Sequence, residues 1–288
     1  MSSGFRRLLV VLAALALGRA GGPARADITF APGTFGPNGD VGFGNSFGSI
    51  AFGDGIASVL QLDGFVNIPG QSGNGFDPGS SYQLSNNQPG NAPLPAGLSY
   101  TFGTPVLSGP HHDELMLTYT FTNNTGATLQ GFQFLVYADA EITNGNSNQF
   151  ATVLGAPGPS KTFQADDPQG SIFTNLSAGA LDNANHKPAP ATPGDVALAL
   201  GFGVSDLSNG ATRTFNVLLS DDGLSLAGVS LTAHGQGSPD SLTLSGATAV
   251  PEPSPLLLGG LALLIGVSAR SARPLLAHYR AAPTLRLP

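Results

Sequence analysis

The chain of 288 residues contains no cysteine and no tryptophan. Because disulfide bonds are excluded, the stability of the folded protein has to come from a hydrophobic core. Tryptophan is absent and tyrosine occurs only five times, so few rings are available to stack against a sugar. This shortage argues against the substrate cleft of a glycan-acting enzyme.

Charged residues make up only 10% of the chain, and the basic ones are rare in its middle. Four arginines precede Asp27 and four follow Glu252. From Asp27 to Glu252, Lys161, Lys187 and Arg213 stand against all 18 acidic residues, which gives this segment a formal charge of −15. Such a surface repels nucleic acid and anionic polysaccharide, keeps a protein soluble, and tolerates or recruits divalent cations. We therefore expect no nucleic-acid partner.

Glycine and proline are abundant, with 40 and 23 residues. Many turn-forming residues and few charges are typical of short strands joined by turns, and they disfavour helices. The segment 27–246 is long enough for one large β domain. We expect an all-β fold, an antiparallel β-sandwich of the jelly-roll or immunoglobulin-like kind with glycine-rich loops.

Two stretches alternate apolar and polar residues with the period of a half-buried strand. In the first, Leu115, Leu117, Tyr119 and Phe121 share one face. A turn at 123–126 follows, and residues 129–138 return with Phe132, Phe134 and Val136 on one face, which predicts a hairpin.

The second unit predicts strands at 196–202 and 215–219, joined by a turn at Asn209-Gly210. Farther along, the apolar positions change parity across Ala227-Gly228, which predicts a β-bulge. Leu242 and Leu244 are expected to close the sheet.

The N-terminal residues 1–26 have the three parts of a secretory signal peptide. Arg6 and Arg7 supply the positive charge, 8–17 is apolar, and 24–26 reads Ala-Arg-Ala. Cleavage by signal peptidase between Ala26 and Asp27 would make Asp27 the first residue of the exported protein. The alternative, a buried N-terminal helix, does not explain this order of charge, apolar core and cleavage site.

The C-terminal end carries a different ordered pattern. Pro251, Glu252 and Pro253 form an acidic motif that proline keeps out of a helix. An apolar stretch at 255–269 follows, and Arg270 and Arg273 end it. As a helix, the uncharged run 256–269 would be about 21 Å long, whereas the hydrocarbon core of a bilayer is about 30 Å thick. The stretch is therefore short for a permanent anchor, and its glycines make it a poor core helix.

This order of motif, apolar stretch and basic stop resembles the PEP-CTERM sorting signal of exported bacterial proteins. The resemblance covers 247–288, with a sparser basic cluster than is usual and an additional tail after Arg273. It implies a transmembrane helix that holds the protein in the inner membrane for a time. It also implies that an exosortase reads Pro251, Glu252 and Pro253 and cuts the chain, which then reaches the cell surface or the extracellular matrix. Exopolysaccharide is a candidate partner there.

Acidic residues at the end of the strand predicted at 129–138 offer the best candidate for a metal site. Asp139 and Glu141 share a face, and Asn144, Asn146 and Asn148 follow in a loop. Carboxylate and amide oxygens are the ligands that Ca²⁺ prefers, although the loop lacks EF-hand spacing. The alternative is a set of ordinary Asx turns. Apart from Ca²⁺, we expect no cofactor.

Two other polar clusters are weaker candidates. The run His111-His112-Asp113-Glu114 has two pairs of residues on opposite faces of an extended strand and no further ligand nearby, so a solvated strand entry is the simpler interpretation. Asp166-Asp167 and Asp221-Asp222-Gly223 are typical of turns.

No motif of a serine hydrolase, a zinc protease or a P-loop nucleotide-binding protein occurs in the sequence. We assign no catalytic residue and expect an exported, non-catalytic surface or matrix protein. The alternatives are an adhesin that binds Ca²⁺ or carbohydrate and, third, an enzyme acting on glycans through carboxylates such as Asp139 and Glu141.

Overall fold

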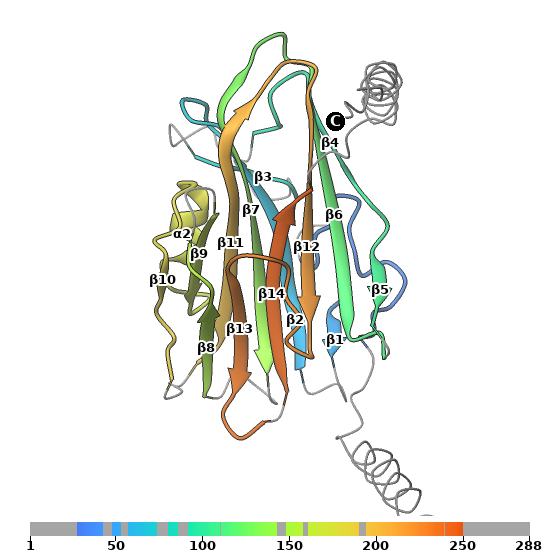
Figure 1. Cartoon of the computed structure of the whole chain (residues 1–288), viewed down its shortest axis with the longest axis vertical. Coiled ribbons are helices and arrows are strands. Elements are labelled where there is room, and N and C mark those ends of the chain that lie inside the picture. Colours follow the sequence, from blue (N-terminus) through green and yellow to red (C-terminus); the bar gives the residue numbers. More distant parts are fainter. Residues whose placement is uncertain are drawn as a thin grey trace, which may run out of the picture. The chain divides into compact units, whose positions relative to one another are not determined.

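The computed structural model describes residues 28–42, 48–52, 57–73, 80–85, 92–109, 111–142, 148–157, 161–189, 194–238 and 240–249. These residues belong to one compact unit that ends at Ala249. They form two seven-stranded sheets and one short helix, α2 (Ile172–Ser177), so the predicted all-β class is confirmed (Figure 1). The predicted signal peptide and C-terminal apolar helix lie outside these residues. Among the residues described, no helix has the length and apolar character needed to span a membrane.

The first sheet has the strand order β1-β2-β7-β11-β9-β10, and β3 pairs with β2. Its strands are β1 (Ile50–Phe52), β2 (Ala57–Asn67), β3 (Tyr82–Gln83), β7 (Leu129–Ile142), β9 (Lys161–Asp166), β10 (Ala184–Asn185) and β11 (Val196–Leu207). Neighbours are antiparallel except for the parallel pair β9 and β10. The long strand β7 lies in the middle of the sheet, between β2 and β11.

The second sheet is antiparallel throughout, with the order β4-β6-β12-β14-β13-β8 and β5 paired to β6. Its strands are β4 (Leu98–Phe102), β5 (Val106–Ser108), β6 (Glu114–Asn123), β8 (Gln149–Leu154), β12 (Thr212–Ser220), β13 (Ser230–Gly235) and β14 (Ser241–Thr248). The two sheets pack face to face, which is the arrangement of a β-sandwich.

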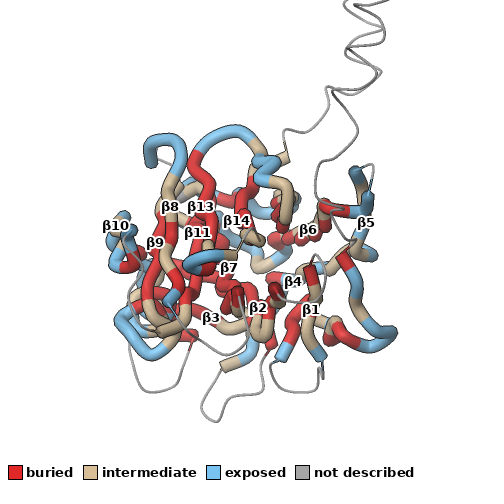
Figure 2. Tube along the Cα trace, turned by 90° about the horizontal axis from the view of Figure 1, so that it is seen from below, coloured by how far each residue is buried: buried red, intermediate tan, exposed pale blue. Residues whose placement is uncertain are grey.

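Aromatic rings from both sheets fill the core between them. The ring of Phe134 in β7 lies 4.9 Å from that of Tyr119, 5.1 Å from Phe215 and 5.4 Å from Phe121, measured between ring centroids. On its own sheet it stacks on Phe202 at 5.8 Å. All five side chains are at most 1% exposed. Figure 2 shows the buried residues along the strands and the exposed residues mainly in loops at the periphery.

The outer face of the first sheet is covered as well. Leu135 and Tyr137 of β7 pack there with Ile172 and Leu176 of α2, in a cluster separate from the main core. Tyr137 and Phe173 rings are 4.6 Å apart. Because β7 is covered on both faces, polar side chains that follow Tyr137 on the outer face also lose contact with water.

The outer face of the second sheet is polar. Thr118, Thr120 and Thr122 of β6 are only partly buried, and each meets a polar partner on β12. The hydroxyl groups of Thr120 and Thr214 are 3.0 Å apart, and those of Thr122 and Thr212 are 3.1 Å apart. The predicted alternation of β6 thus separates a core face from a solvated face.

The predicted hairpin of 115–138 is wrong in its pairing, although both strands exist. β6 pairs with β4, β5 and β12, whereas β7 pairs with β2 and β11. The turn between them crosses from one sheet to the other. Asn123 shapes it, since its Oδ1 accepts a hydrogen bond from the backbone of Thr125 at 3.0 Å and its Nδ2 donates to the carbonyl of Leu207 at 2.7 Å. An apolar strand face is buried equally well by a hairpin neighbour or by a strand across the core, so alternation alone does not decide the pairing.

The pairing of the second predicted unit is wrong as well. Its two strands exist, but β11 belongs to the first sheet and β12 to the second. The bulge predicted at Ala227-Gly228 is also wrong: residues 221–229 form no strand, and Leu224 is 46% exposed. Leu242 and Leu244 lie on a strand as predicted, but β14 sits inside the sheet, between β12 and β13.

Candidate functional site

The end of β7 places two carboxylates on the outer face of the first sheet. Asp139 lies opposite Ala197 of β11 and Gln61 of β2. Its side chain follows Tyr137 on the face that α2 and its flanking segments cover, so Asp139 is only 8% exposed. The Oδ1 atom of Asp139 is buried and has no hydrogen-bond partner. Glu141 follows two residues later on the same face and is partly buried.

Two further polar residues, near the ends of other strands, lie close to Asp139. Asp195 directly precedes β11, and Gln149 begins β8 in the other sheet. The Nε2 atom of Gln149 donates to Oδ1 of Asp195 at 2.9 Å, and the backbone nitrogen of Val196 donates to the same oxygen at 2.9 Å. Gln149 is fully buried, and its Oε1 has no hydrogen-bond partner.

Burial and neighbouring charge both act on these carboxyl groups. Burial, and after it the nearby carboxylates of Asp195, Glu141 and Asp167, raise the pKa of Asp139 from 3.8 to about 7. The pKa of Asp195 is raised by burial as well. A carboxyl group in this situation either keeps its proton near neutral pH or needs a cation beside it. The buried side chain of Lys187 lies 4.0 Å from a carboxylate oxygen of Asp167, measured from Nζ.

Of the residues predicted for this site, the structure describes Asp139, Glu141 and Asn148. Asp139 and Glu141 share a face, as predicted. Asn144 and Asn146 lie outside the described residues, and Asn148 has a left-handed backbone with φ of 59°. Asp195 and Gln149 were missed. The position of Asp195 just before the predicted strand at 196–202 could have indicated that it belongs to this site. Antiparallel pairing brings the start of that strand to the end of β7.

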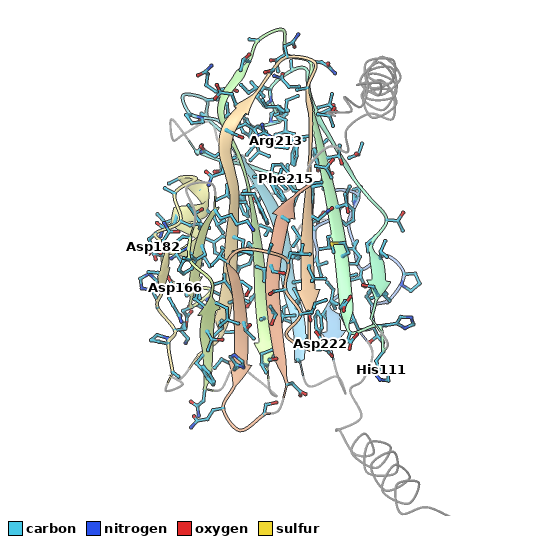
Figure 3. All side chains as sticks on the ribbon, in the orientation of Figure 1. His111, Asp166, Asp182, Arg213, Phe215 and Asp222 are labelled. Atoms are coloured by element: carbon cyan, nitrogen blue, oxygen red, sulfur yellow. The ribbon has the colours of Figure 1, made fainter. Side chains whose placement is uncertain are left out.

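The run His111 to Glu114 does not form the extended strand on which its two faces were predicted. His112 has a left-handed backbone with φ of 53°, and β6 begins only at Glu114. His111 and His112 are exposed, whereas Asp113 is 2% exposed. Figure 3 shows His111 and Asp222 in the lower part of the sandwich, away from Arg213 and Phe215.

Asp166 and Asp167 form a turn, as predicted. The Oδ1 of Asp166 accepts the backbone N–H of Asp167 at 2.8 Å, and its Oδ2 accepts that of Ser171 at 2.9 Å. A side chain on Gly170 would collide with this carboxylate. Both aspartates thus fold the connection from β9 to α2.

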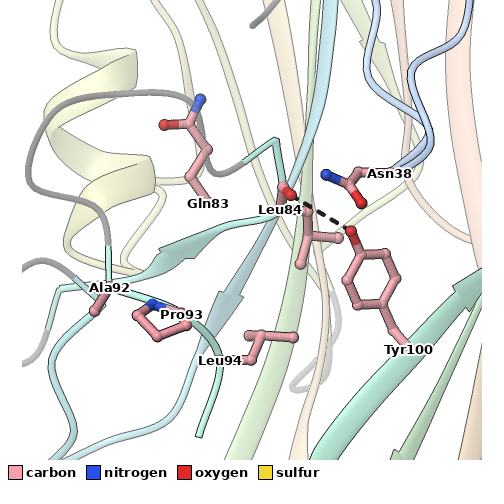
Figure 4. A pocket seen from close by; sticks show the side chains of 7 residues that line it. All are labelled: Asn38, Gln83, Leu84, Ala92, Pro93, Leu94 and Tyr100. Atoms are coloured by element: carbon pink, nitrogen blue, oxygen red, sulfur yellow. Dashed lines mark hydrogen bonds between the residues drawn. The ribbon is translucent and has the colours of Figure 1, made fainter. Parts of the chain in front are cut away.

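A small pocket opens elsewhere, beside β3 and β4 (Figure 4). It has a volume of about 210 Å³, below the range of about 300–1,000 Å³ that is usual for small-molecule sites. Its walls combine amide and phenol groups with apolar side chains: Asn38, Gln83, Leu84, Ala92, Pro93, Leu94 and Tyr100. The buried carboxylate of Asp63 fixes Gln83, whose Nε2 donates to Oδ2 at 2.7 Å. Tyr100 donates its hydroxyl to the carbonyl of Leu84 at 3.4 Å.

The predicted processing residues lie outside the described residues: Ala26, Asp27, Pro251, Glu252, Pro253, Arg270 and Arg273. Comparison with protein-family models and with curated proteins finds no match for this chain.

Proposed function

We propose that this chain is an exported, non-catalytic bacterial protein that an exosortase releases to the cell surface or the extracellular matrix. The observation that carries this proposal is the ordered C-terminal pattern of Pro251-Glu252-Pro253, the apolar stretch 255–269, and the arginines Arg270 and Arg273. Together with the signal-peptide pattern of 1–26, it gives the chain one element for export and one for sorting.

The place where the sandwich ends supports the same proposal. β14 ends at Thr248, and the last backbone hydrogen bond of the compact unit runs from Ala249 to Thr214 at 2.8 Å. The motif begins only two residues later, at Pro251. Cleavage at the motif therefore leaves every strand of the sandwich intact, so the released product keeps its folded body.

The use of carboxylates within the sandwich supports a structural role. Asp63 holds Gln83 and Ser85, Asp166 folds the turn before α2, and Asp206 accepts the backbone N–H of Gly131 at 3.0 Å. Each of these groups has hydrogen-bond donors of the protein itself as partners. The acidic surface repels anionic polymers, so a neutral exopolysaccharide is the better candidate partner.

The test is the fractionation of cells that contain the exosortase, with an antibody against the sandwich. Replacing Glu252 with alanine should leave a longer, membrane-retained species, while the wild-type protein appears outside the cell at lower mass. Asp240→Ala is the control, since it removes one carboxylate from the body and leaves the motif intact. Mass spectrometry of the exported species should give Asp27 as its first residue.

Two outcomes would contradict the proposal. One is the appearance of wild type and Glu252→Ala outside the cell at the same mass, with residues 256–288 still attached. The other is turnover of a polysaccharide by the purified protein, which would make the chain an enzyme.

A second candidate function is a binding module for Ca²⁺, working as an adhesin. One observation favours it: the buried acceptors Asp139 Oδ1 and Gln149 Oε1 have no hydrogen-bond partner and lie at a place rich in carboxylates. Oxygen atoms of this kind are Ca²⁺ ligands. A melting temperature that rises with Ca²⁺ in the wild type and not in Asp139→Asn would support this function.

A further inference from the structure

Three carboxylates of the second sheet lie together where β6 begins and β12 ends. The sequence pattern predicted only a strand entry and a turn for these residues. β6 and β12 pair so that Glu114 lies opposite Ser220. The residue before Glu114 therefore meets the residues after Ser220, and the backbone nitrogen of Asp221 donates to the carbonyl of Asp113 at 3.1 Å. The pairing of the two strands thus brings Asp113 and Glu114 to Asp222.

We propose that Asp113, Glu114 and Asp222 form a Ca²⁺ site. One carboxylate oxygen of each residue lies within 4.8 Å of the other two, and within the described part of the chain this is the one group of three acidic or histidine side chains with that spacing. Ca²⁺ binds oxygen at 2.3–2.6 Å, so oxygens on opposite sides of the ion are about 4.6–5.2 Å apart. Oxygens that all lie within 4.8 Å of one another can therefore reach a single Ca²⁺ ion.

A buried oxygen without a partner is the second observation. Asp113 is 2% exposed, and its Oδ1 accepts no hydrogen bond. A Cβ atom added to Gly109 would collide with this oxygen and would lie 3.4 Å from the carboxyl carbon of Glu114, so Oδ1 is on the side of Glu114. Leaving a buried carboxylate oxygen without a donor or a cation is costly, and a bound ion removes that cost.

The other two carboxylates are held in position by hydroxyl groups. Ser108 Oγ donates to Oε2 of Glu114 at 2.7 Å, and Ser220 Oγ donates to Oδ1 of Asp222 at 2.6 Å. The backbone nitrogen of Leu224 donates to the same oxygen of Asp222 at 2.8 Å. These bonds fix the direction of both side chains before an ion arrives, which reduces the entropy lost on binding.

The basic residues of the body make their contacts elsewhere. Lys161 donates to backbone carbonyls of Ala227 and Gly246, and Arg213 to those of Ser205 and Asp206. Lys187 faces Asp167. The exposed His111 and His112 precede the group without belonging to it. The two lysines and the arginine of the body thus have partners outside the group of three carboxylates.

Calorimetric titration of the full-length chain with CaCl₂, after treatment with EDTA, tests the site. We expect a dissociation constant of about 0.1–1 mM, as in extracellular Ca²⁺ modules, and weaker binding of Mg²⁺. Asp222→Asn should reduce the affinity at least tenfold, because the amide keeps the oxygen that accepts from Leu224 and loses the charge. Glu114→Gln should act in the same direction. Asp206→Asn is the control, since Asp206 also accepts a backbone N–H but lies outside the group.

The same titration of Asp139→Asn separates this site from the pair on β7. Binding that persists in Asp139→Asn and is lost in Asp222→Asn supports the proposal. Wild-type affinity and stoichiometry in Asp222→Asn, or no heat of binding for the wild type up to about 10 mM Ca²⁺, would overturn it. Neither result depends on export, so the outcome is independent of the sorting proposal.

Discussion

Replacing Asp139 with asparagine should change how the stability of the protein depends on pH. Burial, together with the neighbouring carboxylates, raises the pKa of this carboxyl group from 3.8 to about 7. Between these two pH values the folded state keeps a proton that the unfolded chain has released. The unfolded state then binds fewer protons than the folded state, so the free energy of unfolding falls as pH rises from about 4 to about 7 and stays level above that.

The size of this effect follows from the pKa difference. Each pKa unit corresponds to 1.36 kcal/mol, so raising the pKa from 3.8 to about 7 corresponds to about 4 kcal/mol. Structural relaxation and water penetration reduce such penalties in real proteins, so we expect about 2–4 kcal/mol. Asparagine has no charge to bury and avoids the penalty. In EDTA, Asp139→Asn should therefore be more stable than wild type at pH 8 and similar to it at pH 4.

The assay is urea unfolding of both proteins at several pH values, in EDTA and in millimolar Ca²⁺. Subtracting the stability of the mutant from that of the wild type at each pH isolates the contribution of Asp139. Other groups with a raised pKa, such as Asp63, contribute equally to both proteins. Asp206→Asn serves as the control and should follow the wild type. If Ca²⁺ binds at Asp139, the wild type regains stability at pH 8 with the logarithm of Ca²⁺ concentration, and Asp139→Asn regains less.

One result would refute this reasoning about burial. If Asp139→Asn is less stable than wild type at pH 8 in EDTA, the carboxylate is ionised and favourably paired, and the buried Oδ1 does not carry the penalty that we assign to it. A difference that is constant with pH would have the same meaning.

Three further predictions concern the sandwich. Phe134→Ala should destabilise the protein by about 3–5 kcal/mol in urea unfolding, since it removes a fully buried ring from the centre of the core, and Phe134→Leu should cost less. The hydrogen bond that the His186 ring donates to the carboxylate of Asp182 raises the pKa of His186. The stabilisation from this pair is therefore present below about pH 6.5 and is lost as pH rises through the raised pKa; Asp182→Asn should lower the pKa of His186 in an NMR titration. Lys161→Met should destabilise by roughly 1–3 kcal/mol in the same unfolding assay, because the ammonium group donates to the carbonyl of Gly246 in the other sheet and to that of Ala227 in the segment before β13.

The strands and their core faces were predictable from alternation, and their partners were not. The side chains of Leu115, Leu117, Tyr119 and Phe121 are buried as the pattern required. The same pattern was compatible with a hairpin, whereas the structure crosses between the sheets at Asn123. The two crossing turns contact each other, since Gly126 donates its N–H to Oδ1 of Asn209 at 2.8 Å. A contact between positions so distant in the sequence leaves no trace in either local pattern.

The candidate sites show the same limit. Asp139 and Glu141 were found because they share one strand, whereas Asp195 and Gln149 reach the place from other strands. Asp113 and Asp222 each looked like part of a local feature. Only the pairing of β6 with β12 makes them neighbours. Residues on one strand are related by the period of that strand, but residues on different strands are related only by the register of the sheet.

The topology also collects acidic residues at one end of the sandwich. β7 ends where β11 begins, and Gln149 at the start of β8 joins that place to the second sheet through Asp195. At the same end, β6 begins and β12 ends, so Asp113, Glu114 and Asp222 lie at the end that also holds Asp139 and Asp195.

The chain leaves the sandwich at the opposite end. Thr248, at the end of β14, lies opposite Phe215, near the start of β12 and far along that strand from Ser220. The acidic groups that we propose as Ca²⁺ ligands, which follow Ser220 or lie where β6 begins, are therefore at the end of the sandwich away from Thr248.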